Sequence, residues 1–202
     1  MKRNTAFTTK EVNLLANKNL FAAKARIIQK LSKELLLLEE LYVEEVSTKK
    51  ETLSEEILKN RGKITKGENL NNLPWMVLDY PRLFNRKNIF AIRTLVWWGK
   101  HISVSLVVSG NFKKLYEERV FKELNSAKFN ALYICISNTV WEHDFTKENY
   151  CKTSQLSKKI IDGIKERNFL KISFKIHVKE INELQSKALT KFKLLLRLLH
   201  NN

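Results

Sequence analysis

The spacing of apolar side chains along this chain alternates between the steps of a helix and the steps of a strand. Residues 10–46 place apolar side chains three and four positions apart with almost no breakers, which predicts a long amphipathic helix. Thr52 followed by Glu55 matches a capping box, and a second helix is expected to end near residue 60. The two helices should form an antiparallel hairpin. Residues 61–74, rich in Lys, Gly and Asn, are expected to form a loop.

The strongest strand signal lies between Leu73 and Gly110, a segment that holds three of the four tryptophans and both prolines. Apolar runs at 90–98 and 102–109 flank a short Gly-Lys-His break, the pattern of two strands joined by a tight turn. This segment is therefore expected to be the centre of the fold.

The remainder of the chain alternates between helix and strand patterns. In chain order we expect a helix at 112–125, a strand at 131–137, a loop at 138–152, a helix at 154–167, a strand at 169–178 and a helix at 180–200. The strand at 169–178 places Lys171, Ser173, Lys175 and His177 on one side, so that side is expected to face water.

These elements predict an α+β protein. We expect an antiparallel or mixed sheet of four to five strands with helices packed on one face, preceded by the N-terminal helical hairpin. The hairpin would span residues 1–62 and the α+β domain residues 63–202, packed together as one compact unit. A length of 202 residues suits such an arrangement.

Composition indicates an intracellular setting. Two cysteines, Cys135 and Cys151, give no disulfide framework, so reduced thiols are expected. No stretch approaches the ~18 apolar residues of a membrane-spanning helix, and the amino terminus lacks the apolar core of a signal peptide. The sequence therefore predicts a cytoplasmic protein without a membrane segment.

The formal net charge of +16 is concentrated in residues 61–110 and 151–202. A basic surface of this kind attracts anions and is one feature of nucleic-acid-binding proteins. Lysine far outnumbers arginine, however, and solvated lysines on helix faces give the same total. A compositional origin is favoured, and nucleic-acid binding through these two regions is the weaker alternative.

The tetrapeptide Asp79-Tyr80-Pro81-Arg82 resembles a binding site because its carboxylate follows an apolar run. Arg82 or Arg93 could pair with Asp79 or with a carboxylate or phosphate of a ligand. The alternative is a structural turn held by an Asp-Arg bridge, which we favour.

Two aromatic motifs contain histidine. In Trp141-Glu142-His143-Asp144 the two carboxylates should raise the pKa of His143 if they lie close to it in space, which would prepare it to donate a proton. The competing interpretation is a loop histidine without a catalytic role. Trp97 and Trp98, next to Lys100 and His101, could stack a base or a sugar, but core packing of both is favoured.

No catalytic or cofactor motif is present. The chain has no GxSxG, HExxH, CxxC, GxGxxG or Walker pattern, and its histidines show no paired metal-ligand spacing. Neither a metal nor a cofactor is therefore expected.

Three blocks, KGENLNNLPWMVLDYPRLF, IFAIRTLVWWG and ALYICISNTVWEHDFTKENY, are similar to a family of uncharacterised bacterial proteins of similar length. The resemblance covers roughly residues 66–150, and the LDYPR and WWG segments are its most distinctive parts. It implies that the three blocks belong to one domain. It implies no activity, cofactor or site, so no functional residue is carried over.

The leading functional hypothesis is a binding protein for a small anionic ligand or an acidic partner. Its pocket would be lined by Asp79, Tyr80, Arg82, Arg93, Trp98 and His143. An enzyme that uses Asp79 or His143 as general acid or base is the second hypothesis. The apolar stripe of the 10–46 helix also predicts a partner helix. That partner is either the 180–200 helix or, slightly favoured, the same helix in a homodimer.

Overall fold

The computed structural model describes residues 6–48, 53–124 and 126–200, so the expected cap residue Thr52 lies outside the described residues. The helices are α1 (Thr9–Leu15), α2 (Lys18–Ser47), α3 (Glu55–Leu58), α4 (Asn111–Glu123), α5 (Lys158–Lys165) and α6 (Leu184–Arg197). The strands are β1 (Lys63–Leu70), β2 (Leu73–Phe84), β3 (Ile89–Trp97), β4 (His101–Ser109), β5 (Leu132–Cys135), β6 (Tyr150–Lys152) and β7 (Phe169–His177).

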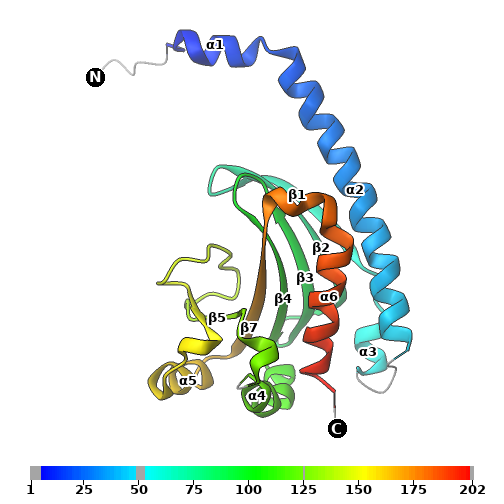
Figure 1. The fold of residues 1–202 in the computed structure, drawn as a ribbon, viewed down its shortest axis with the longest axis vertical. Helices are drawn as coiled ribbons and strands as arrows, with labels where there is room; N and C mark the ends of the chain where they lie inside the picture. Colours follow the sequence, from blue (N-terminus) through cyan, green and yellow to red (C-terminus); the bar gives the residue numbers. More distant parts are fainter. Residues whose placement is uncertain (1–5, 49–52, 125, 201–202) are drawn as a thin grey trace.

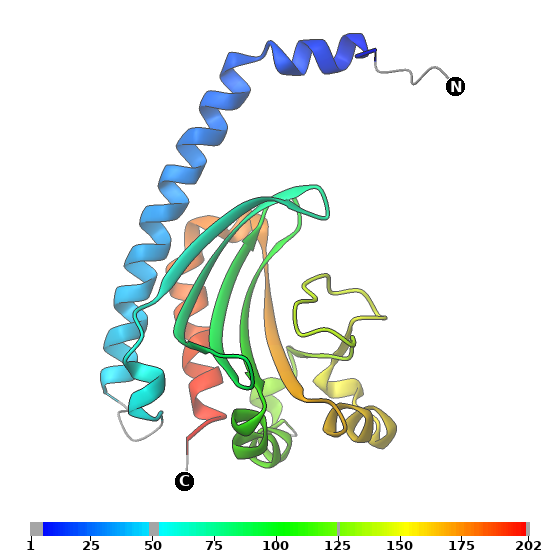
Figure 2. The ribbon, with the colours of Figure 1, turned by 180° about the vertical axis from the view of Figure 1, so that it is seen from behind.

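In the described part of the chain, seven strands form one sheet in the order β1-β2-β3-β4-β7-β5-β6, and neighbouring strands are antiparallel (Figures 1 and 2). The α+β class is confirmed, but the expected number of four to five strands was too low. β1 lies where a loop was expected at 61–74, and β6 lies inside the expected loop at 138–152. β1 is a half-exposed edge strand with few apolar residues, so it lacks the alternation that marks a buried strand.

Asparagine makes the turn that pairs β1 with β2. Asn71 and Asn72 both have positive φ, 50° and 62°, the backbone that a two-residue hairpin turn requires. Asn tolerates this left-handed conformation better than most residues. The Asn-rich composition of 61–74 was therefore a hairpin signal as well as a loop signal.

The N-terminal helices differ from a simple hairpin. The apolar pattern at 10–46 is interrupted at Asn17, whose side chain caps α2 by accepting a hydrogen bond from the Leu20 amide at 3.0 Å. α3 is a single turn of four residues and is too short to cover α2. The lower half of α2 packs instead against α6, as Figure 1 shows, with the rings of Tyr42 and Phe192 stacked 3.8 Å apart.

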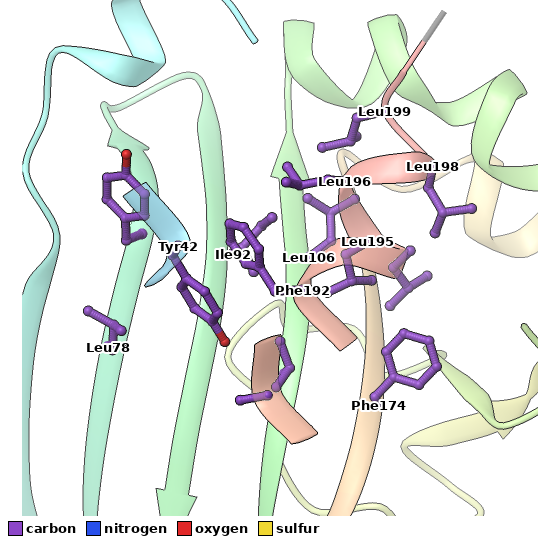
Figure 3. Packing of buried hydrophobic residues seen from close by; sticks show 14 of the residues in the cluster. Tyr42, Leu78, Ile92, Leu106, Phe174, Phe192, Leu195, Leu196, Leu198 and Leu199 are labelled. Carbon is purple, nitrogen blue, oxygen red and sulfur yellow. The ribbon is translucent and has the colours of Figure 1, made fainter. Parts of the chain in front are cut away.

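Alternation along the strands gives the sheet two different faces. On β4 and β7 the even-numbered residues, such as Leu106 and Phe174, join the core beneath α2 and α6 (Figure 3). The odd-numbered residues of these strands, including Ser105, Lys171 and Ser173, point to the opposite side. We call this side the second face of the sheet. The segment of residues 136–149, between β5 and β6, lies against it (Figure 2).

The core beneath α2 contains one buried polar contact whose strength can be tested. The Tyr42 hydroxyl lies 2.9 Å from Thr94 Oγ1, and both residues are completely buried. We expect Tyr42→Phe to lower the free energy of unfolding by about 1–3 kcal/mol, because Thr94 then loses its buried partner. Urea unfolding of Tyr42→Phe, Thr94→Val and the double variant would measure this. If the double variant loses the full sum of the single losses, the hydroxyls do not interact.

Candidate functional site

An ion pair between neighbouring strands lies at the middle of the second face. Asp79 and Arg93 are cross-strand partners on β2 and β3, and Arg93 Nε and Nη2 donate to the two carboxylate oxygens at 2.7 and 2.9 Å. Asp79 is buried, and the guanidinium carbon of Arg93 lies 4.9 Å from the ring centre of Trp141. The guanidinium is thus held between a carboxylate and an indole. Both oxygens of Asp79 are engaged, as the structural interpretation predicts.

Lys171 is a buried cation two strands away from Arg93. Its Nζ donates to the Val140 carbonyl at 3.0 Å and to the Glu142 carbonyl, and it lies 3.4 Å from Nδ1 of His143. Burial, with a smaller effect of the Arg93 charge, lowers the pKa of Lys171 to about 7, although Cys135 and Glu142 act in the opposite direction. Among the described residues, no carboxylate lies within 4 Å of this ammonium. Lys171 therefore fastens the 136–149 segment to the sheet through neutral acceptors.

The prediction that its neighbours raise the pKa of His143 was wrong. Burial lowers this pKa to about 2, helped by the positive charges of Lys171 and Arg93. The adjacent carboxylates are used elsewhere. Glu142 Oε1 accepts the backbone amides of His143 and Asp144 at 2.8 and 2.7 Å, and Asp144 pairs with Lys100 at 3.0 Å. His143 is consequently neutral at pH 7.

His101 is a second neutral, buried histidine on the same face. Its pKa is lowered to about 4 by burial, and Lys175 adds to the effect. The ring packs edge-on against Trp97 and Phe145, with centroid distances of 5.4 and 4.8 Å. Its Nε2 is buried and has no hydrogen-bond partner within the described residues. Burial first, and neighbouring positive charges second, therefore lower the pKa of both histidines.

The turn between β2 and β3 borders a small cavity at one end of the second face. The cavity measures about 190 Å³, and its lining includes Arg86, Lys87, Asn168 and Val140 but no acidic side chain. We call it the turn cavity. Asn85 Oδ1 accepts the amides of Lys87 and Asn88 at 3.0 and 2.7 Å, which fixes the turn.

Gly110 allows this turn to approach the start of α4. Its φ is +58°, and an added Cβ would lie 2.3 Å from both the Lys87 carbonyl oxygen and Asn88 Oδ1. Asn88 Oδ1 also accepts the Asn111 amide at 2.8 Å. The two cationic side chains of the turn are therefore carried on a rigid backbone.

Two exposed aromatic side chains lie next to the turn cavity. Phe84 directly precedes the turn and Trp141 directly follows Val140; their ring centres are 6.3 Å apart. Trp141 is 48% exposed and Phe84 38% exposed. The pair forms an apolar rim above Arg93.

The structure divides the six residues of the predicted pocket between the two faces of the sheet. It brings Asp79, Arg93 and His143 together on the second face, around Lys171 and Trp141. Tyr80 and Trp98 pack on the helical side.

Tyr80 lines a cavity of about 610 Å³ beside α2, and burial, then the charge of Glu39, raise its pKa. Arg82 is the cross-strand partner of Ala91 on β3, and its Nε donates to the carbonyl of Arg61 at 3.0 Å. Arg82 is therefore engaged with the segment ahead of β1 rather than with Asp79.

Sequence reasoning missed the residues that give the second face its charge. Lys171 was expected on a wet strand face but is only 1% exposed, because the 136–149 segment covers it. No local pattern marks a lysine that a distant loop covers. Arg86 and Lys87 follow Asn85 in a hairpin turn, and that turn signal was available in the sequence.

Within residues 6–48, 53–124 and 126–200, no group of three or more His, Cys, Asp or Glu could hold a metal ion. No helix among these residues is both long and apolar enough to cross a bilayer. No protein-family model, curated protein or solved structure matches the chain.

Proposed function

We propose that this protein binds a small anionic ligand in the turn cavity, with a flat or apolar part of the ligand lying against Trp141. The observation that carries the proposal is the charge of the cavity lining, which has Arg86 and Lys87 and no carboxylate. Cations presented on a rigid turn bind an anion without losing much side-chain and backbone freedom.

Lys171 supports the same ligand class from below the cavity. Val140 lines the cavity, and its carbonyl accepts a hydrogen bond from the buried Lys171 ammonium. When Lys171 is protonated, a buried ammonium with no carboxylate within 4 Å among the described residues leaves a positive potential in a region of low dielectric. An anion in the turn cavity would be stabilised by this potential as well as by Arg86 and Lys87.

The aromatic rim favours a ligand that carries a ring or another apolar part in addition to its anionic group. The half-exposed ring of Trp141 already packs on Arg93 with one part of its surface. The exposed part, together with Phe84, offers a stacking surface beside the cationic turn. An anionic group in the cavity and a ring on the rim would match this arrangement.

The cavity cations can be tested with inorganic phosphate and a nucleoside monophosphate as probes. We expect Arg86→Ala/Lys87→Ala to weaken binding of both probes at least about tenfold, because each lost charge-assisted hydrogen bond contributes about 1.5–3 kcal/mol. Isothermal titration calorimetry at low salt would measure this. The matched control is Lys114→Ala/Lys122→Ala, which removes two exposed cations from α4. Equal losses in the two double variants would contradict a specific site.

The rim is tested separately with Trp141→Ala. This variant should weaken the nucleoside monophosphate about fivefold or more and leave phosphate unchanged, since only the ring contacts Trp141. A short single-stranded oligonucleotide serves as the competing probe. If wild-type protein binds it and neither monophosphate nor phosphate, the surface is a nucleic-acid interface and the small-ligand proposal is wrong.

A further inference from the structure

Charge is segregated along α2, the longest helix of the molecule. Residues 18–33 carry five basic side chains and no acidic one, whereas residues 34–47 carry five glutamates and no basic one. The helix is about 45 Å long at ~1.5 Å per residue. Its basic half extends past the sheet, as Figures 1 and 2 both show, while its acidic half lies beside α6.

An exposed seam runs along one side of α2, next to its buried stripe. Its members are all exposed and recur at steps of three, four or seven residues: Ala22, Ala25, Gln29, Leu36 and Val43. The buried stripe of the same helix consists of Leu31, Leu35, Leu38, Tyr42 and Val46. Leu36 and Val43 are 53% and 44% exposed and border the cavity of about 610 Å³ beside α3. The seam therefore carries two alanines and a glutamine in its basic half, and larger apolar side chains in its acidic half.

We infer that α2 pairs antiparallel with α2 of a second copy of this chain along this seam. A two-fold axis near residues 32–33 places Ala22 opposite Val43 and Gln29 opposite Leu36. The same operation sets Arg26 of one copy beside Glu39 and Glu40 in the acidic half of the other, where Glu40 and Glu44 flank the seam. The small side chain of Ala22 opposite Val43 allows the two helices to approach closely.

Charge decides both the partner and the orientation. A parallel pair would align five basic side chains with five others, and five glutamates with five others, which is repulsive. An antiparallel pair aligns each basic half with an acidic half. Because the two halves belong to one helix and complement each other, a second copy satisfies the whole seam.

The contact can be tested by charge reversal in the full chain. Wild-type protein at tens of micromolar should have twice the 23.8 kDa mass of the chain by light scattering at low salt. Arg26→Glu and Glu40→Lys/Glu44→Lys should each weaken dimerisation at least about tenfold, because like charges then meet across the seam. An equimolar mixture of the two variants should recover the dimer. The matched control, Lys114→Glu/Lys122→Glu on α4, should dimerise like the wild type.

Two results would overturn the antiparallel α2 pair. A wild-type mass of one chain at low salt would overturn the inference. Dimers that the single-sided reversals do not weaken would point to a parallel pair or another surface, and would also overturn it. All substituted residues are exposed, so far-UV circular dichroism of each variant should match the wild type and exclude misfolding as the cause.

Discussion

Replacing Asp79 by alanine should lower the free energy of unfolding by about 3–5 kcal/mol, because the change leaves the guanidinium of Arg93 without its partner in a mostly buried position. The side chain of Arg93 is only 14% exposed, so water replaces little of the lost interaction. Chemical denaturation would measure the loss. Asp162→Ala, which removes an exposed carboxylate from α5, is the control and should change stability by less than about 0.5 kcal/mol.

The double variant separates the interaction energy of the Asp79–Arg93 pair from the energies of its other contacts. Asp79→Ala/Arg93→Ala should lose clearly less than the sum of the two single losses, since no unpaired charge remains buried. A loss below about 1 kcal/mol in Asp79→Ala would show that water or Trp141 compensates for the carboxylate. The ion pair would then not hold this part of the sheet together.

Lys171 should make stability rise with pH above neutrality. Its pKa is about 7 in the folded chain and has an ordinary value of 10.5. Between these values the unfolded state holds a proton that the folded state has released, so stability increases with pH by up to about 1.4 kcal/mol per unit. Below pH 7 lysine is charged in both states and adds no slope.

The measurement compares wild type with Lys171→Met from pH 6 to 10 by urea unfolding. The stability of the wild type relative to the variant should climb through this range, since methionine carries no proton. Lys175→Met, on the same strand face but exposed, should keep the slope of the wild type. Parallel curves for wild type and Lys171→Met would show that Lys171 stays charged when folded.

The sequence predicted those parts of the fold that depend on local apolar spacing. β3, β4 and β7 were found because their alternation is strong, and so was the core stripe of α2 with Leu35 and Tyr42. β1 and β6 were missed because they are short or polar edge strands whose pairing depends on a neighbour. The spacing of apolar residues shows which face of an element is buried. It therefore identifies edge strands poorly, because they bury few side chains.

The candidate site depended more on distant contacts than on motifs. Asp79 and Arg93 form a bridge, as the structural interpretation expected, but the bridge joins paired strands β2 and β3 rather than holding a turn. The prediction that Asp79 and Tyr80 line one pocket was wrong. Consecutive residues of a strand point to opposite faces, and Tyr80 packs in the core on the helical side. The pKa of His143 was misjudged because burial and Lys171, both set by the tertiary fold, outweigh the adjacent carboxylates.

The two edges of the sheet limit how these molecules meet one another. The outer strand at one edge, β1, carries the exposed lysines Lys63 and Lys66, and at the other edge β6 is only three residues long. Charged or very short edge strands oppose the addition of a strand from another molecule, the step that begins amyloid-like aggregation. Crowded copies of this protein should therefore remain free of fibrils, even though the sheet between those edges is rich in β-branched residues.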